Sequence, residues 1–153
     1  MITSKINYTT KTATTFNIEG HLTACKENFT PPLNETIDIE AYSFKIYKFA
    51  VTFEAWYNNQ LVGLIAAYFN DEINKTAFIT NVSVLKSFQG FGIASALLKK
   101  CIEYAKKNNM QKIALEVHTA NSSAINLYRK FCFIENITRS SSKMIFFEKN
   151  LYI

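Results

Sequence analysis

Two glycines separated by one residue lie between an apolar segment and an amphipathic helical pattern. The segment reads Gln89-Gly90-Phe91-Gly92, and the helical pattern begins directly after it. The first N–H groups of a helix have no partner within the helix, and the helix dipole is positive at that end. Glycines just before such a helix let the backbone approach an anion closely. The segment therefore predicts a site for a diphosphate group, although a lone Gly-x-Gly is also typical of an ordinary tight loop.

The helix after the loop is strongly amphipathic. Its apolar residues recur at the spacing of one buried face: Ala94, Leu97, Leu98, Cys101, Ile102 and Ala105. Its opposite face is charged: Lys99, Lys100, Glu103, Lys106 and Lys107. Asn108 and Asn109 are a typical helix stop. The pattern predicts a helix that is buried along one side and begins at the glycine loop.

A hairpin and a third strand precede the loop. The residues of 51–57 are rich in β-branched and aromatic types, Asn58-Asn59 is a turn signal, and 61–70 is a second strand. The second strand shows little alternation, which predicts burial on both of its faces. After a loop at 71–75, a third strand at 76–84 leads into the glycine turn.

The remaining elements complete an alternating order. We expect a short strand at 2–8, a helix at 14–28 that ends before Pro31-Pro32, and a helix from Asp38 to Phe49. A strand at 112–117, a helix at 122–130 and closing strands at 133–138 and 144–149 follow. This order predicts an α/β (α+β) fold with a mixed sheet and one domain over residues 1–153. Strands 76–84 and 112–117 are expected to be parallel, with a right-handed crossover.

Composition excludes several classes of protein. With 48% hydrophobic and 14% aromatic residues, the chain is a folded globular protein. No apolar run has the length of a membrane span, so we expect no membrane partner. The N-terminus lacks the apolar core of a secretion signal, which predicts a cytoplasmic location. The net charge of +5 comes from scattered lysines without a dense basic run, so nucleic acid is not an expected partner.

Cysteine and histidine give little support for a metal site or a disulfide. Cys25, Cys101 and Cys132 are odd in number and far apart, which favours buried side chains over disulfides or metal ligands. His21 and His118 are too few and too far apart for a convincing metal site. We expect no bound metal.

Two motifs together resemble those of the GNAT superfamily of acyl-CoA-dependent N-acyltransferases. The family signature Arg/Gln-x-x-Gly-x-Gly/Ala is met by the segment from Gln89 to Ala94. A second family feature is met by Asn121, Ala124, Leu127, Tyr128, Lys130 and Phe133. The two lie in the family's order and at its usual separation, and the order of elements matches over nearly the whole chain. The first fifty residues add little motif support.

The resemblance implies acetyl-CoA as cofactor and acyl donor. It implies a sheet of about six or seven strands flanked by about four helices, with a V-shaped opening between strands 76–84 and 112–117. Backbone N–H groups would hold the diphosphate at Gln89, Gly90, Phe91, Gly92, Ile93, Ala94 and Ser95. The pantetheine arm would pair like an added strand with the main chain of Val82, Ser83 and Val84.

Tyr128 is the residue we expect to perform proton chemistry. A tyrosine hydroxyl can donate a proton or a hydrogen bond to the departing CoA thiolate. Its alternative is a core tyrosine, because its neighbours form an apolar helix face. Asn121 is placed to bind the cofactor arm, or to cap the next helix, or both. Lys130 is a candidate for the adenosine 3′-phosphate, with a solvated side chain as its alternative.

An attacking amine must be neutral, which requires a base or a water relay. Glu116, near the end of a strand, and Glu54, on a strand of mostly apolar residues, are the candidates, although either could face solvent or pair with a lysine. The resemblance places the acceptor among residues 16–50 and the closing strands. The acids there, Glu35, Asp38 and Glu40, would suit a cationic amine or serve a helix dipole. The resemblance also makes a homodimer possible.

The sequence therefore favours an N-acetyltransferase that modifies a primary amine of a small molecule or peptide. One alternative is a non-catalytic sensor of the same fold that binds acyl-CoA. Another is a dinucleotide-binding enzyme, because Gly90-x-Gly92 after a strand imitates the nicotinamide fingerprint. That fingerprint requires a third glycine, and Ser95 stands at its place.

Overall fold

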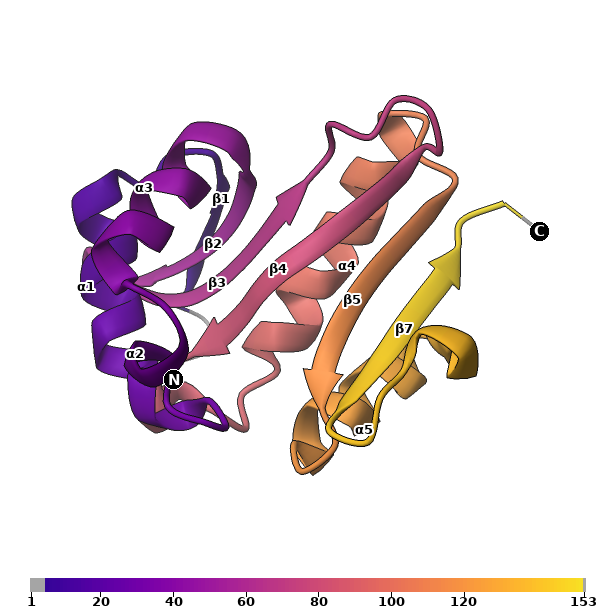
Figure 1. Ribbon diagram of the computed structural model, residues 1–153. Helices are drawn as coiled ribbons and strands as arrows, with labels where there is room; N and C mark the ends of the chain where they lie inside the picture. The colour runs from indigo at the N-terminus through magenta and orange to yellow at the C-terminus, as the bar shows by residue number, and fades with distance from the viewer. Residues whose placement is uncertain (1–4, 153) are drawn as a thin grey trace.

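The computed structural model describes residues 5–152 and contains one seven-stranded mixed sheet (Figure 1). The strand order is β1-β2-β3-β4-β5-β7-β6, and neighbouring strands are antiparallel except for β4 and β5, which are parallel. The strands are β1 (Asn7–Thr10), β2 (Val51–Tyr57), β3 (Gln60–Tyr68), β4 (Thr76–Val84), β5 (Lys112–His118), β6 (Ile134–Glu135) and β7 (Met144–Asn150). The predicted mixed sheet, fold class and parallel pair are confirmed.

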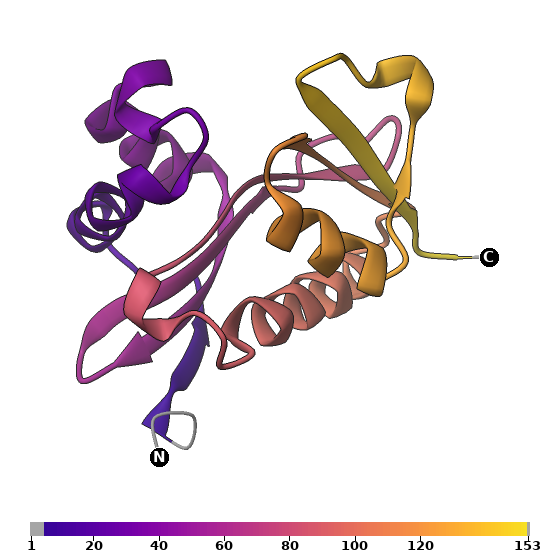
Figure 2. The same ribbon diagram turned by 90° about the horizontal axis from the view of Figure 1, so that it is seen from below.

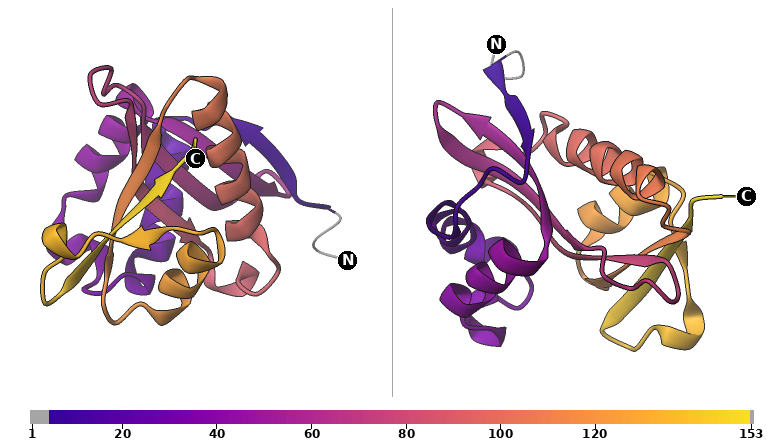
Figure 3. Two further views of the ribbon diagram at one scale, coloured as in Figure 1. Left: turned by 90° about the vertical axis from the view of Figure 1, so that its right-hand side faces the viewer. Right: turned by 90° about the horizontal axis from the view of Figure 1, so that it is seen from above.

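Helices cover the two faces of the sheet unequally (Figures 2 and 3). Three helices lie on one face beside β2 and β3: α1 (Thr15–Cys25), α2 (Leu33–Thr36) and α3 (Ile39–Phe49). Two lie on the other face: α4 (Ile93–Lys107) and α5 (Ser122–Lys130). Short 3-10 turns complete the chain: η2 (Lys26–Asn28), η3 (Lys86–Phe88) and η4 (Ile137–Arg139). Among residues 5–152, no helix is both long and apolar enough to cross a membrane.

The start of α4 is fixed by close packing on β3. The buried face of the helix is the predicted one, with Ile93, Leu97, Leu98, Cys101, Ile102 and Ala105 all buried. A Cβ atom at Gly63 of β3 would lie 2.7 Å from Cγ2 of Ile93, so only glycine allows the helix to approach this closely. Burial of each large aliphatic side chain contributes roughly 1.5–3 kcal/mol. Packing therefore holds the first turn of α4 at the end of β4.

β4 and β5 separate at their C-terminal ends. Their pairing runs from Thr76↔Lys112 to Ile79↔Leu115 and then stops, although both strands continue (Figure 1). On its other side, β4 has a register shift against β3, where Ala66 faces Asn81 and Ala67 faces Ile79. Thr80 is thus the extra residue of a β-bulge, which bends a strand. The expected V-shaped opening between these strands is confirmed, and its start coincides with the bulge.

The bulge also reverses which face of the sheet alternate residues of β4 occupy. Before it, Ala77 and Ile79 belong to the core under α4, and after it Val82 and Val84 pack against the same core. Ser83 instead reaches the α1 side, where its hydroxyl lies 2.9 Å from Nε2 of His21. A one-residue insertion has this effect because side chains alternate with a period of two. The polar side chains of Asn81 and Ser83 therefore face the α1 side of the sheet.

Several predicted boundaries are wrong. Residues 2–4 lie outside the described residues, Lys5 and Ile6 are not in a strand, and β1 begins only at Asn7. The expected helix at 14–28 ends as a helix at Cys25 and continues as a 3-10 turn, and α2 was not expected at all. The closing strand at 133–138 is reduced to β6, because η4 follows it. Cys132 is exposed in a left-handed turn, whereas Cys25 and Cys101 are buried as expected.

Candidate active site

The loop before α4 presents a row of unpaired backbone N–H groups. Ala96 is the first residue of the helix whose N–H is bonded, to the carbonyl of Gly92 at 3.0 Å. Within residues 5–152, the N–H groups of residues 90–95 have no acceptor. Gly92 is the N-cap, and it has no side chain to cap these donors. Its φ of 79° and the φ of 85° at Gly90 lie in the left-handed region, which explains glycine at both positions.

A groove of about 460 Å³ runs from these donors into the opening between β4 and β5. Its lining contains the predicted cofactor-binding residues Val82, Ser83, Val84, Gln89, Gly90, Gly92, Ile93, Ala94, Ser95 and Asn121. Phe91 does not line the groove, and its side chain is 42% exposed. Lys130 is exposed and also lies outside the lining. The structure thus brings together ten of the twelve residues that the sequence singled out for the cofactor.

Two side chains tie the loop to the end of β4. Nε2 of Gln89 donates to the carbonyl of Val84 at 3.1 Å, and Nδ2 of Asn28 donates to the same oxygen at 3.3 Å. The signature glutamine therefore has a structural role, since it fixes the glycine loop against the strand. Because the Val84 carbonyl is already engaged, Val82 is the better position for main-chain pairing with a ligand.

A second pocket, of about 340 Å³, lies on the other side of the opening. Both strands contribute to it, as do the segment from Phe29 to Ile37 and the helices α3 and α5. We call it the acceptor pocket. Its polar lining consists of Thr30, Tyr42, Thr80, Asn81, Glu116, His118, Asn121 and Tyr128. Of these, Asn121 also lines the groove, and Val82 lines both cavities. The two cavities therefore meet where the strands separate.

Tyr128 lines the acceptor pocket, and its helix neighbour Leu127 lines the groove. Its side chain is 5% exposed, and its ring packs against Phe133 and Phe147 at centroid distances of 5.8 and 6.0 Å. Within residues 5–152 no hydrogen bond acts on its hydroxyl, and burial alone perturbs it. Burial raises the pKa of the phenol, so it stays protonated at neutral pH. The geometry thus provides a neutral donor that no internal group uses.

Asn121 caps α5, which is one of the two roles that the sequence predicted for it. Its Oδ1 accepts the N–H of Ala124 at 3.3 Å, at the N-terminus of α5. Its Nδ2 has no acceptor in the described part of the chain, and the residue lines both cavities. The cap holds the amide in place while its donor remains available.

Glu116 and His118 share one face of β5, two residues apart, and both line the acceptor pocket. Glu116 is exposed, and no cation lies within ion-pair distance of it among residues 5–152. Nδ1 of His118 accepts the N–H of Ala120 at 3.0 Å, which leaves the proton of the neutral ring on Nε2. The pocket thus contains a carboxylate and an imidazole donor side by side.

Glu54 lies elsewhere and is fully used by the fold. It is 0% exposed, and its carboxylate accepts hydrogen bonds from the hydroxyls of Thr9, Thr12 and Thr52 at 2.6 Å each. The N–H groups of Thr12 and Ala13 add further bonds at 3.1 and 2.8 Å. Burial acts to raise the pKa of Glu54, but these bonds outweigh it and the pKa is lowered. The carboxylate is a structural anion and does not line either cavity.

A buried polar chain supports the acceptor side of β4. Nδ1 of His21 donates to the carbonyl of Leu61 at 3.0 Å, and Nε2 lies 2.9 Å from the Ser83 hydroxyl. That hydroxyl lies 2.8 Å from Oδ1 of Asn81. Burial lowers the pKa of His21 to about 4, so the ring is neutral at physiological pH. Tyr42 adds a bond to the carbonyl of the bulge residue Thr80 at 2.8 Å.

Sequence reasoning missed His118 as a member of the site, together with Tyr42, Thr80 and Asn81. His118 was detectable, because it follows Glu116 by two residues on the same predicted strand. The other three were not, since their placement depends on the bulge. The acids Glu35, Asp38 and Glu40 do not line the acceptor pocket, and Asp38 caps α3 through Ala41 at 3.1 Å.

Comparison with known proteins agrees with this geometry. Residues 18–133 match the Acetyltransferase (GNAT) family. The chain is 27% identical over 123 residues to N-alpha-acetyltransferase MAK3 of Arabidopsis thaliana, covering 79% of this chain and 65% of that protein. The matched region covers 65% of the length of the Arabidopsis protein, and 42% and 36% of the lengths of two further curated relatives.

Solved structures show the same fold. A GNAT acetyltransferase from Staphylococcus aureus superposes with a TM-score of 0.76 at 20% identity, covering 95% of this chain and 99% of that one. The PaiA N-acetyltransferase of Thermoplasma acidophilum, in complex with coenzyme A, gives 0.71 at 16% identity over 94% and 99%. The family match covers most of the chain, and the fold agrees with it throughout. The chain belongs to the GNAT family of acetyltransferases.

Proposed function

We propose that this protein transfers the acetyl group of acetyl-CoA to the primary amine of a small molecule or peptide. The observation that carries the proposal is the row of unpaired N–H groups at the start of α4, opening into a groove that shares Val82 and Asn121 with the acceptor pocket. Structures of similar proteins in complex with coenzyme A or acetyl coenzyme A support the choice of ligand.

The groove residues fit a CoA molecule in two ways. The donors of residues 90–95 suit a diphosphate, because unpaired amides and the helix dipole both favour an anion there. The main chain of Val82 lies beyond the last β4–β5 pair, so it is open to strand-like pairing with the amides of a pantetheine arm. Acetyl-CoA supplies the acetyl group as a thioester.

Residues of the acceptor pocket divide the proton chemistry. Glu116 accepts a proton from the attacking amine, directly or through a water molecule, as the nitrogen–carbon bond forms. The Tyr128 hydroxyl donates to the sulfur as the carbon–sulfur bond breaks. Main-chain N–H groups of β4 stabilise the charge that develops on the carbonyl oxygen. Nε2–H of His118 orients the amine or the relaying water.

Thermal-shift titration with acetyl-CoA, CoA and NAD tests the ligand. The melting temperature should rise with the concentration of acetyl-CoA and CoA, since a ligand that binds only the folded state stabilises it, and should not change with NAD. A response to NAD alone would support the dinucleotide alternative and contradict the proposal.

Release of free thiol with a panel of amines then tests catalysis. An acetyltransferase releases CoA only when an accepted amine is present. Stabilisation by acetyl-CoA without thiol release for any amine in the panel would support the alternative of a non-catalytic sensor.

A further inference from the structure

A third cavity, of about 600 Å³, is the neighbour of the acceptor pocket along the sheet, and α3 and η4 contribute to its lining. The two cavities occupy successive positions on the same strands: Thr80 and Phe78 on β4, Glu116 and Ala114 on β5, and Met144 and Phe146 on β7. On α3, Tyr42 lines the first and Lys45 the second. We call this cavity the distal compartment. Its lining comes from α3, β3, β4, β5, β7, η4 and the loop that follows β3.

Two cations line the distal compartment from opposite walls. Nζ of Lys45 lies 5.5 Å from the ring centre of Tyr68, and Cζ of Arg139 lies 4.0 Å from the ring centre of Phe146. Both rings also line the cavity, so each cation is held over an aromatic surface. An anion that entered the compartment would meet positive charge on two sides.

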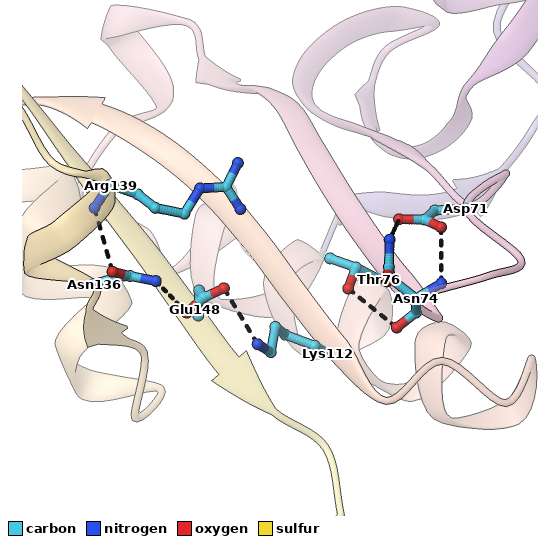
Figure 4. A network of polar contacts seen from close by, with 7 residues as sticks. All are labelled: Asp71, Asn74, Thr76, Lys112, Asn136, Arg139 and Glu148. Carbon is cyan, nitrogen blue, oxygen red and sulfur yellow. Dashed lines mark hydrogen bonds and ion pairs between the residues drawn. The ribbon is translucent and has the colours of Figure 1, made fainter.

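Neither cation is neutralised by the protein. Lys112–Glu148, at 3.3 Å, is the ion pair found within residues 5–152. Figure 4 shows the Arg139 guanidinium without a contact to the six other residues drawn. Asp71 also lines the compartment and keeps its charge, because its oxygens accept only from the neutral Asn74, through the N–H at 3.0 Å and Nδ2 at 3.4 Å. It pairs with neither cation, so the two cations exceed it by one positive charge. The charge on the two walls is therefore available to a ligand.

The hydroxyl of Tyr68 gives a second indication. Its oxygen is buried without a partner at hydrogen-bond distance in the described part of the chain. Burial raises the pKa of the phenol, and the nearby Thr80 side chain offsets this only in part. Such an orphaned group is costly, and it is normally paired in the functional state. Lys45 is exposed and long, so its ammonium can turn toward an anion bound beside this hydroxyl.

We propose that the acceptor carries a carboxylate that binds in the distal compartment, between Lys45, Arg139 and the Tyr68 hydroxyl. This inference rests on the proposed function, since the amine would lie in the acceptor pocket beside Glu116. Two to three strand residues separate Phe78 from the opening at Thr80 and Asn81, so the carboxylate lies roughly 7–10 Å from the amine. An acidic acceptor of tripeptide length satisfies this distance.

Triglycine and triglycinamide are matched probes, because they differ only in the terminal charge. Calorimetric titration of each into the protein saturated with CoA should give a Kd about tenfold lower for triglycine. Lys45→Met with Arg139→Met should bring this ratio close to one, since methionine keeps the length of the side chains and removes their charge. Tyr68→Phe should lower the ratio by about threefold and leave the fold intact.

Lys48→Met is the matched control. Lys48 is also on α3 and also lies over aromatic rings, 5.5 Å from Phe49 and 5.8 Å from Phe44, but it does not line the compartment. Its ratio should equal that of the unaltered protein. Equal affinity for the two tripeptides, binding of neither, or a preference that survives the double substitution would overturn the proposal.

Thiol release separates this proposal from the acetyltransferase function. If amines that lack a carboxylate are acetylated while the two tripeptides bind equally, the proposal of an acidic acceptor is wrong and the acetyltransferase function stands. If triglycine binds preferentially but no amine in the panel releases thiol, the anion site stands and the acetyltransferase function is wrong.

Discussion

Within residues 5–152, the backbone N–H groups near the start of α1 bind an anion of the protein itself, whereas those at the start of α4 have no acceptor. Before α1, the N–H groups of Thr12 and Ala13 and three threonine hydroxyls hold the carboxylate of Glu54. Before α4, the N–H groups of residues 90–95 hold nothing from the described chain. The chain supplies its own anion at the first place and glycine at the second. The first is therefore structural, and the second is suited to a ligand.

Side-chain type makes the same distinction. Thr14 caps α1 through a capping box with Asn17, so the N–H groups of Thr14 and Asn17 are satisfied internally. Gly92 at the corresponding position of α4 offers no capping oxygen. An unfilled helix start is tolerated on the surface because water can occupy it, and a diphosphate can replace that water.

Removal of the internal anion should have the largest effect on stability. Glu54→Ala leaves two N–H groups and three hydroxyls without their shared acceptor, and we expect a loss on the order of 3 kcal/mol in the free energy of unfolding. Urea denaturation measures it. Glu116→Ala is the control, with a change within about 0.5 kcal/mol because Glu116 is exposed. A loss for Glu54→Ala as small as that of the control would contradict its structural role.

A carboxylate introduced at the N-cap of α4 should strongly weaken CoA binding. Gly92→Asp adds a carboxylate at the N-cap of α4, where it would accept the free N–H groups and repel a diphosphate. We expect the Kd for CoA, measured by calorimetry, to rise by roughly 100-fold, equal to about 2.7 kcal/mol. Gly92→Asn is the matched control, since it fits the left-handed backbone without the charge and should lose less. Equal losses for the two variants would argue against an anion at this position.

The Tyr128 hydroxyl is also a donor without an internal acceptor, and its removal should lower kcat without weakening CoA binding. Tyr128→Phe removes the proton donor and keeps the packing against Phe133 and Phe147, so we expect kcat to fall by roughly 10–100-fold with little change in the Kd for CoA. Thiol release and calorimetry measure the two quantities. Unchanged turnover would remove Tyr128 from the mechanism.

Protonation of Glu54 at acid pH should have the smallest effect, a partial loss in the free energy of unfolding. Because the folded-state pKa of Glu54 is below its ordinary value of 4.5, its contribution is complete above about pH 4.5 and is lost as the pH falls through the folded-state pKa. Urea midpoints at neutral pH and near pH 3 should therefore differ more for the unaltered protein than for Glu54→Gln. Equal pH dependence of the two proteins would show that the carboxylate is not stabilised by its hydrogen bonds.

The unfilled place was predictable from the sequence, and the filled one was not. Gly90, Gly92 and the apolar face of α4 are adjacent in the chain, so their pattern alone predicts an open helix start after a strand. Glu54 looked like a candidate base because an acid is unusual on an apolar strand. Its partners Thr9, Thr12 and Ala13 lie more than forty residues away, and only the pairing of β1 with β2 brings them to it.

The acceptor side was hidden from the sequence for the same reason. The bulge at Thr80 has no local signal, yet it turns Asn81 and Ser83 toward α1 and coincides with the start of the opening. The distal compartment combines α3 with η4, and η4 occupies residues for which the sequence indicated a strand. Contacts between distant segments determine both features.

NMR titration of the backbone amides tests the central claim most directly. With CoA, the amide resonances of Gly92, Ile93, Ala94 and Ser95 should shift in proportion to occupancy, because these N–H groups bind the diphosphate. Pantetheine, which lacks the diphosphate, should leave them in place while it shifts Val82. Saturation with CoA that leaves the four amide resonances unmoved would contradict the account.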